Sequence, residues 1–242
     1  MTAPESLVVT GLQASYGRVR IVEDVNLRLD RGEMVALVGR NGVGKTTSLL
    51  SIAGLRYGPG GGTVRVGDVD ITRATPHAIV AAGVVLVPEG HRVFKELTVS
   101  DNLKLGAYSR RRRNRAEIAA DMDRVTELFP ILGQFALRQV GSLSGGQQQM
   151  VAVGQALMSR PRFLLLDEPM SGIAPTLVDE LYDRLRQLVR EGIGIVVVDQ
   201  SIERALDRSD RFSVMDNGRI ALTGTSNRSA CEAANAIVLG VR

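Results

Sequence analysis

A glycine-rich segment, Gly39-Arg-Asn-Gly-Val-Gly-Lys-Thr46, constrains the fold of this 242-residue chain more than any other feature. It matches the phosphate-binding pattern G-x-x-x-x-G-K-[ST], which chance should produce in roughly 1 of 100 chains of this length. The apolar run Met34–Val38 before it is typical of a buried strand, and a helix is expected from Lys45 to about Ala53, stopped by Gly54. Because glycines let the backbone aim its N–H groups at an anion, this strand–loop–helix unit predicts a phosphate-binding α/β domain.

The remaining pattern predicts strands and helices in alternation. After Leu143 the expected order is a helix to Met158, a strand at Phe163–Asp167, a helix at Pro175–Arg190 and a strand at Ile193–Val198. Such alternation favours a parallel sheet with crossover helices. Further strands are expected at Leu7–Thr10, Val19–Leu29, Thr63–Val66 (an edge strand) and Val84–Val87, with a turn at Gly58–Gly62 and a hairpin turn at Asp216–Arg219.

Between Thr98 and Gln139 the sequence becomes helical and charged. Thr98-Val-Ser-Asp101 is typical of a helix start capped by Ser or Asp, and Ala116–Phe129 has helical spacing that Pro130 ends. The sequence therefore predicts an α/β core with a helical insertion near residues 89–142.

Composition limits the class of protein. Apolar residues make up 44% of the chain, yet no apolar run approaches the roughly 18 residues needed to span a bilayer. The N-terminus carries Glu5 and no long apolar segment, so no secretory signal is expected, and the single cysteine, Cys231, fits a reducing compartment. These features predict a soluble, cytosolic chain.

The formal net charge is +4, and the densest basic cluster is Arg110–Arg115. This cluster could contact lipid head groups or nucleic acid, or it could be a solvated loop that leads into the next helix. It lacks the interleaved aromatic residues that single-strand binding requires. We therefore expect no nucleic-acid partner.

Four side chains suit nucleotide chemistry. In the phosphate loop, Lys45 is expected to reach the β- and γ-phosphates, and the Thr46 hydroxyl to ligate Mg²⁺. Asp167 follows a buried-type strand, where open α/β sheets place ligands, and is expected to hold Mg²⁺ through water. Glu168 is the candidate general base that polarises the attacking water. The alternative is a structural carboxylate pair that caps Pro169 and the next loop.

Leu143-Ser-Gly-Gly-Gln147 places glycines where a helix begins, which leaves backbone N–H groups for an anion, although a helix cap without a ligand is the alternative. Together with the phosphate loop and the strand that ends in Asp167 and Glu168, this segment resembles the ATP-hydrolysing subunit of an ABC transporter. The resemblance implies that ATP and Mg²⁺ bind, and that two subunits dimerise head to tail, each signature covering the other's γ-phosphate. It implies a single ABC ATPase domain, 1–242. Residues 1–88 and 143–242 would form the P-loop NTPase (RecA-like) core with a parallel sheet, together with an N-terminal antiparallel β subdomain. Residues 89–142 would form the α-helical subdomain.

The resemblance also assigns nucleotide-binding residues. They are Tyr16, Gly39, Arg40, Asn41, Gly42, Val43, Gly44, Lys45, Thr46, Thr47, Glu89, Ser144, Gly145, Gly146 and Gln147. Tyr16 would stack on adenine, or it could be a buried strand tyrosine. The family usually has glutamine where this chain has Glu89, and Glu89 could also ligate Mg²⁺. The family usually has histidine where this chain has Gln200, and often aspartate where it has Ala174. Gln200 could hydrogen-bond the γ-phosphate but cannot carry a positive charge.

The residues at which the chain departs from the general family pattern resemble those of one subgroup. Val87-Pro-Glu-Gly90, Gly172-Ile-Ala-Pro175 and Asp199-Gln200 resemble the ATPase subunits of branched-chain amino acid importers, although urea and amide importer ATPases share much of this wording. The resemblance implies transmembrane permease partners, an indirect substrate-binding protein, and a peripheral position on the inner face of the cell membrane. The permease contact is expected in the helical insertion and in the segment from Glu89 to Val99.

Two other functions remain open from the sequence. A soluble ABC ATPase that acts on DNA or ribosomes is disfavoured because the chain has one nucleotide motif, and the gap of about 100 residues before the signature lacks heptads. A regulator that no longer hydrolyses ATP is suggested by Gln200 and disfavoured by the presence of Lys45, Asp167 and Glu168.

Overall fold

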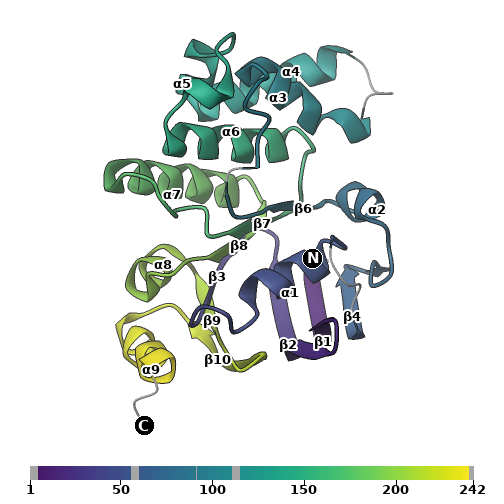
Figure 1. The fold of residues 1–242 in the computed structure, drawn as a ribbon, viewed down its shortest axis with the longest axis vertical. Coiled ribbons are helices and arrows are strands. Elements are labelled where there is room, and N and C mark those ends of the chain that lie inside the picture. The colour runs from purple at the N-terminus through teal and green to yellow at the C-terminus, as the bar shows by residue number, and fades with distance from the viewer. Residues whose placement is uncertain (1–4, 56–59, 91, 111–114, 240–242) are drawn as a thin grey trace.

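A computed structural model describes residues 5–55, 60–90, 92–110 and 115–239. Its centre is a sheet whose strand order is β5-β4-β1-β2-β10-β9-β3-β8-β7-β6 (Figure 1). The neighbours β9, β3, β8, β7 and β6 run parallel. Their bounds are Arg211–Asp216, Met34–Val38, Gly194–Val198, Phe163–Asp167 and Val84–Val87. The predicted α/β fold with a parallel sheet is therefore confirmed.

The first part of the chain adds antiparallel strands to this sheet. Strand β1 (Ser6–Tyr16) pairs with β2 (Val19–Asp30) on one side and with β4 (Gly61–Val66) on the other, and β5 (Val69–Asp70) follows β4. The antiparallel strands meet the rest of the sheet through β10 (Arg219–Thr225), which joins β2 at the pair Arg219–Asp24.

The parallel strands are covered on both faces. Every residue of β3, β7 and β8 is buried, as expected of apolar strands between two layers of other elements. Along β7, Leu164 and Leu166 join the core that contains the long helices, whereas Phe163 and Leu165 join the core beneath β1 and β2. The alternation follows from the two-residue period of a strand and explains why the run contains no polar residue before its end.

The helices form two groups. On one face lie α6 (Gly145–Leu157) and α7 (Pro175–Arg190), and above them in Figure 1 lie α3 (Val99–Gly106), α4 (Arg115–Leu128) and α5 (Pro130–Gln134). The other helices are α1 (Lys45–Ile52), α2 (Pro76–Ala81), α8 (Ile202–Arg208) and α9 (Arg228–Leu239), and 3₁₀ turns lie at Tyr108–Arg110 and Val140–Ser142. Among the described residues, no helix combines the length and the apolar character that crossing a membrane requires.

Most elements lie where the sequence predicts them, and the exceptions have local causes. Strand β1 continues to Tyr16 because Gly11, with a φ of +61°, allows irregular pairing within a longer strand. Thr63–Val66 is not an edge strand, since the two-residue β5 pairs outside it. The cap of α3 is Thr98, whose hydroxyl accepts the Asp101 N–H at 3.1 Å, rather than Ser or Asp.

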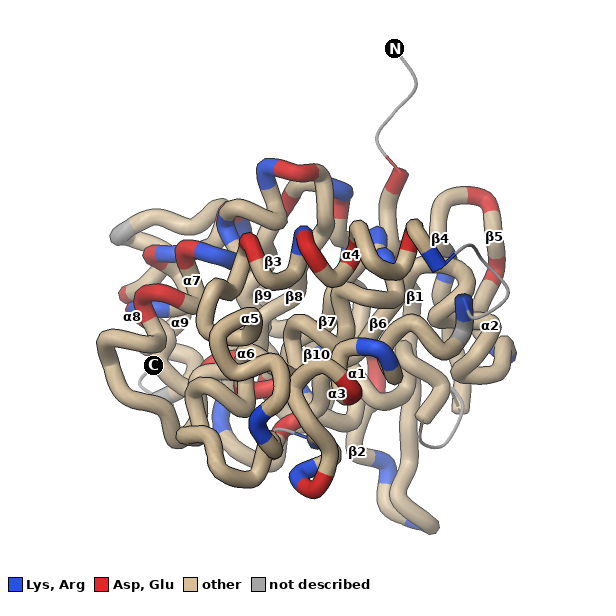
Figure 2. Tube along the Cα trace, turned by 90° about the horizontal axis from the view of Figure 1, so that it is seen from above, with Lys and Arg blue, Asp and Glu red and all other residues tan. Residues whose placement is uncertain are grey.

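Other differences concern short helices. Helices α2 and α8 fall outside the predicted elements, and Pro130 begins α5 as well as ending α4. The predicted turn at 58–62 and the basic cluster at 110–115 lie partly outside the described residues. Where charged residues are described, Lys and Arg are interleaved with Asp and Glu over the molecule (Figure 2).

Candidate nucleotide site

Four segments meet at one edge of the sheet. The phosphate loop follows β3, Glu89 follows β6, Asp167 and Glu168 end β7, and Gln200 follows β8. Since β3, β8, β7 and β6 are adjacent and parallel, their carboxyl ends share this edge. Open α/β sheets place their ligands at this edge.

The backbone of the phosphate loop requires glycine. Gly39, Gly42 and Gly44 have φ angles of +152°, +81° and +109°. A Cβ atom on Gly39 would lie 2.3 Å from the Met215 carbonyl oxygen, and one on Gly44 would lie 3.1 Å from the Ile21 carbonyl oxygen. The loop therefore packs directly on the backbone of β2 and β9 and keeps its conformation without side chains at these positions.

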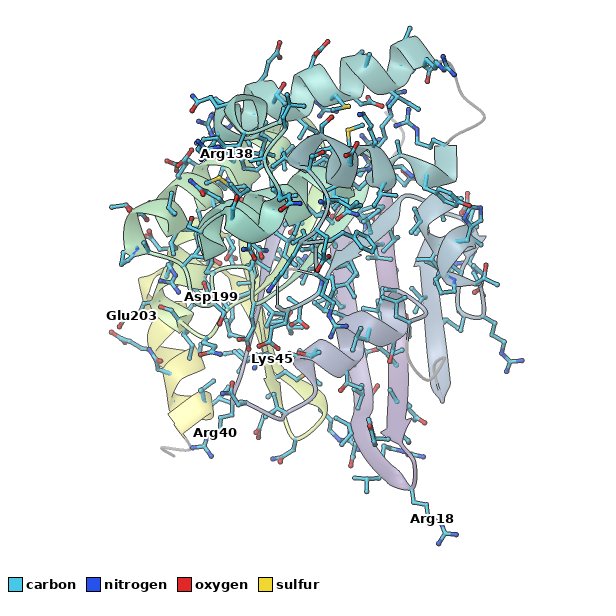
Figure 3. All side chains as sticks on the ribbon, turned by 45° about the horizontal axis from the view of Figure 1, so that its top comes forward. Arg18, Arg40, Lys45, Arg138, Asp199 and Glu203 are labelled. Atoms are coloured by element: carbon cyan, nitrogen blue, oxygen red, sulfur yellow. The ribbon has the colours of Figure 1, made fainter. Side chains whose placement is uncertain are left out.

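Lys45 lies inside this loop rather than in solvent. Its side chain extends from the first residue of α1 (Figure 3), and the residue is 5% exposed. Its Nζ donates to the carbonyl oxygens of Gly39 at 2.7 Å and Arg40 at 2.9 Å. Burial lowers the pKa of Lys45, and the negative charges of Glu168 and Asp167 act in the opposite direction. An ammonium group has three donors, so one remains for a ligand at the mouth of the loop.

Thr46 and Asp167 form the part of the site that suits a metal ion. The Thr46 hydroxyl donates to Asp167 Oδ1 at 3.1 Å. Asp167 is 1% exposed, and its Oδ2 is buried without a hydrogen-bond partner among the described residues. Burial, with the charges of Glu168 and Glu89, raises the pKa of Asp167 to about 6, against the lowering effect of Thr46 and Lys45.

An unpaired buried carboxylate oxygen beside a hydroxyl is a donor set that fits Mg²⁺. Within the described part of the chain, no group of three or more His, Cys, Asp or Glu side chains could hold a metal by itself. A cation here would therefore take further ligands from the nucleotide and from water, as Mg²⁺ does beside phosphates.

Glu168 and Gln200 are in direct contact. Gln200 Nε2 donates to Glu168 Oε2 at 2.6 Å, and the Glu168 backbone N–H donates to the Val198 carbonyl oxygen at 3.1 Å. Glu168 has a φ of +48°, a left-handed conformation that is uncommon for a residue with a side chain. This turn places the Glu168 carboxylate at the strand edge. The structure therefore brings together Glu168 and Gln200, two predicted site residues that lie 32 positions apart in the chain.

The predicted signature is built as a helix cap. Ser144 Oγ accepts the Gln147 N–H at 3.4 Å, and Gln147 Oε1 accepts the Ser144 N–H at 3.0 Å, which forms a capping box at the start of α6. Helix α6 lies apart from α1 (Figure 1). The chain therefore does not bring its own signature to its own phosphate loop.

Tyr16 and Arg40 are both exposed. Tyr16 is 57% exposed, so the alternative of a buried strand tyrosine is wrong. Arg40 extends toward α9 (Figure 3), where its Nε donates to the Val238 carbonyl oxygen. Arg40, Asn41, Gly42 and Val43 line one side of an open hollow of about 570 Å³ between β2 and the β9–β10 turn.

One buried group beside the site was not among the predicted site residues. Asp199 lies between β8 and Gln200 and accepts hydrogen bonds from Tyr182 and Arg204. A carboxylate directly after an apolar run is the signal that identified Asp167, and the same signal could have identified Asp199.

Known proteins show the same organisation. The family described as ABC transporter matches residues 22–171. The high-affinity branched-chain amino acid transport ATP-binding protein BraG of Pseudomonas aeruginosa is 38% identical over 87% of this chain and 88% of its own. The probable branched-chain amino acid transport ATP-binding protein LivF of Archaeoglobus fulgidus is 36% identical over 89% of this chain and 90% of its own. The sulfate/thiosulfate import ATP-binding protein CysA 2 of Chromobacterium violaceum is 38% identical over 91% of this chain and 59% of its own.

Among solved structures, the ADP conformation of an ATP-binding cassette of an ABC transporter superimposes with a TM-score of 0.86 at 25% identity. The match covers 98% of both chains.

Proposed function

Because the chain belongs to the ABC transporter family, as an ATPase subunit whose hydrolysis is coupled to transport, we propose that it energises an importer of branched-chain amino acids. The observation that carries the ATPase part of the proposal is the meeting of Lys45, Asp167, Glu168 and Gln200 at the strand edge beside the glycine-rich loop.

In the proposed mechanism the phosphate loop binds the nucleotide. The backbone N–H groups of the loop and the start of α1 surround the phosphates, and Lys45 donates its remaining N–H to the β- and γ-phosphate oxygens. Thr46 and Asp167, with Glu89 close by, would hold Mg²⁺, which neutralises charge on the phosphates when it is bound. Tyr16, at the exposed end of β1, offers a ring face to the base.

Glu168 is the proposed general base. Its carboxylate accepts a proton from the attacking water, while Gln200 holds one carboxylate oxygen and leaves the other for that water. Because glutamine has no ionisable group, the Gln200 side chain stays neutral across the physiological pH range.

The Glu168→Gln variant tests this assignment. We expect ATP hydrolysis to fall at least 1,000-fold, because an amide cannot accept the proton, while ATP binding changes by less than about threefold. Hydrolysis and binding should be measured on the same preparation, with Glu180→Gln as the matched control. Glu180 is a partly exposed acidic residue on α7 that pairs with Arg184. Unchanged turnover in Glu168→Gln would remove Glu168 from this role.

The substrate assignment is supported by two relatives whose names state branched-chain amino acid transport, and by Val87-Pro-Glu-Gly90 and Asp199-Gln200. A sulfate/thiosulfate importer subunit is equally identical over the matched region, so a direct test is needed. In a reconstituted transporter, a binding protein loaded with leucine should stimulate hydrolysis more than the same protein loaded with urea. Stronger stimulation with urea would redirect the proposal to the amide importers, and equal stimulation would contradict the assigned substrate.

We further propose that a cytosolic segment of the permease binds beside the helical subdomain, residues 89–142. An apolar groove of about 430 Å³ lies between α2, β6, α3 and α6, and Val80, Leu105 and Tyr108 line it. Phe94, within the segment from Glu89 to Val99 that leads into α3, is 53% exposed. A membrane protein contact would cover these apolar side chains and complete a transporter.

Cysteine crosslinking tests the permease contact. In a Cys231→Ser background, cysteines at Phe94 and Glu96 should crosslink to a membrane chain, whereas a cysteine at Arg18 should not. Arg18 lies at the tip of the β1–β2 hairpin (Figure 3). Absence of a crosslink from any position in 89–105 would refute the assigned surface.

A further inference from the structure

Among the described residues, Asp199 is the buried carboxylate with the most hydrogen bonds that the nucleotide chemistry leaves unused. It is 4% exposed, and each oxygen accepts two hydrogen bonds. Oδ1 accepts from the Ser201 N–H at 2.9 Å and from Arg204 at 3.1 Å. Oδ2 accepts from the Tyr182 hydroxyl at 2.8 Å and from Arg204 at 3.2 Å. Asp199 therefore connects the end of β8 to α7 and α8 through one side chain.

These bonds surround the backbone of the next residue, Gln200. On one side, β8 is fixed between β3 and β7, and the Val198 carbonyl oxygen accepts the Glu168 N–H. On the other side, the Ser201 N–H is bound to Asp199, and Ser201 Oγ caps α8 by accepting the Arg204 N–H at 3.4 Å. Asp199 thus holds the chain on both sides of Gln200: it directly precedes Gln200, and its carboxylate binds the N–H of Ser201, which directly follows.

The Gln200 side chain needs this support. Gln200 is exposed, and an exposed glutamine loses rotamer freedom when it holds a single geometry. Its amide nevertheless contacts Glu168 Oε2 at 2.6 Å. A fixed backbone therefore keeps the Gln200 amide within reach of Glu168. A shift of the amide by about 1 Å would break a hydrogen bond of this length.

We propose that Asp199 is a positioning residue for hydrolysis, an inference that rests on the proposed role of Glu168. Its carboxylate is held by Tyr182 of α7 and Arg204 of α8, and it fixes the turn so that Gln200 orients the Glu168 carboxylate. Tyr182 is 1% exposed, and its burial together with the charge of Asp199 raises its pKa, so it remains a hydrogen-bond donor. Asp199 itself touches neither nucleotide nor water in this scheme.

The Asp199→Asn variant tests the proposal. An asparagine directs N–H groups at donors, so it cannot reproduce four accepted bonds, and the turn should lose its fixed position. We expect kcat to fall about 10- to 100-fold, as is typical when a catalytic group is misplaced, with the KM for ATP within twofold of wild type. Tyr182→Phe should show the same change to a smaller degree, and Asp199→Glu, which keeps the charge, should restore kcat to within about threefold of wild type.

A matched control separates positioning from general destabilisation. Asp210 accepts two bonds from Arg186 of α7 and one from the Met34 N–H, at the opposite end of β3 from the site. Asp210→Asn should lower stability while leaving kcat unchanged. In a Gln200→Ala background, Asp199→Asn should lower kcat by no more than twofold, because the group that it positions is absent. A further full loss in that background would overturn the proposal.

A measurement without turnover keeps this inference distinct from the proposed function. The measurement is hydrogen exchange of the Gln200 side-chain amide in nucleotide-free protein. The amide signal is the one that is absent in Gln200→Ala. Its hydrogens should exchange slowly with solvent in the wild type and in Asp210→Asn. In Asp199→Asn the exchange should be at least tenfold faster. Unchanged exchange would refute the positioning role, whereas a wild-type chain without ATPase activity at any concentration would count against the proposed function alone.

Discussion

At the scale of single residues, Asp167 carries a cost that its position explains. Its carboxylate is 1% exposed, and Oδ2 has no hydrogen-bond partner among the described residues, a state that burial makes unfavourable for the charged form. The pKa of Asp167 is raised to about 6 as a result. A buried carboxylate without a partner lowers the stability of the fold. Such a residue is expected where ligand binding, and not stability, determines the residue type.

This cost predicts that Asp167→Asn stabilises the nucleotide-free protein. Because the folded-state pKa of about 6 lies above the unfolded value of 3.8, the protonated form stabilises the fold below pH 3.8, and that stability is lost as the pH rises through 6. At pH 7.5 the variant should therefore gain about 2 kcal/mol in free energy of unfolding, at 1.36 kcal/mol per pKa unit with partial compensation from lost contacts.

Urea unfolding at pH 7.5, 6 and 5 measures this effect. The gain of Asp167→Asn over wild type should shrink at each step, and Asp123→Asn, at an exposed position on α4, should change stability by less than about 0.5 kcal/mol at every pH. A gain that is the same at all three pH values would assign the effect to packing instead of charge.

At the scale of elements, α3 and α6 make an unusually close contact. A Cβ atom on Gly106 would lie 1.9 Å from the Gln155 carbonyl oxygen, so the two backbones approach more closely than a side chain allows. Farther along the same interface, Gly154 leaves room for Leu103, Val125 and Leu132, whose atoms would lie 3.0–3.1 Å from an added Cβ. Gly106 on α3 and Gly154 on α6 thus let α3, α4 and α5 pack against α6.

The contact predicts a strong effect of one added methyl group. Gly106→Ala should lower the free energy of unfolding by about 3 kcal/mol, because backbone atoms cannot move aside as a side chain would. Gly133→Ala is the matched control on α5, where the nearest atom to a new Cβ is 3.5 Å away. It should be neutral or stabilising by up to about 1 kcal/mol, as alanine favours a helix over glycine. Equal effects of the two variants in thermal or urea unfolding would show that α3 and α6 can separate.

At the scale of the whole molecule, the phosphate loop and the predicted signature of one chain lie in different places. The strand edge supplies the phosphate loop and the carboxylates, while the capped start of α6, Ser144 to Gln147, lies apart from them (Figure 1). The helix start nevertheless presents backbone N–H groups that suit an anion. A second copy or a related chain, arranged head to tail, is the proposed source of the missing half.

Complementation between two inactive variants tests this arrangement. Lys45→Ala removes phosphate binding, and Ser144→Arg blocks the signature. Each variant alone should hydrolyse ATP at least 100-fold more slowly than wild type. An equimolar mixture should recover activity, because a mixed dimer contains one site with an intact phosphate loop facing an intact signature.

The concentration dependence of hydrolysis completes the test. The wild-type rate per subunit should rise with protein concentration where a homodimer forms. If hydrolysis stays negligible at every concentration while ATP binds, the second half of the site comes from a different chain.

The sequence alone determined the local parts of this protein. The phosphate loop, the strands Met34–Val38 and Phe163–Asp167, the helix Pro175–Arg190 and the Asn217-Gly218 hairpin turn lie as predicted, since each depends on short-range patterns of apolar residues and glycines. The family follows from three such segments in order. Short helices such as α2 and α8 lack a long apolar period and escaped prediction.

Only the tertiary structure decided which side chains meet. Strand order brings β8 between β3 and β7, and this placement puts Gln200 against Glu168 and leaves Asp199 to bind Tyr182 and Arg204. Contacts between residues far apart in the chain depend on register and packing, which no short window of sequence contains. For the same reason, the exposure of Tyr16 and the separation of α6 from the phosphate loop became evident only in the folded chain.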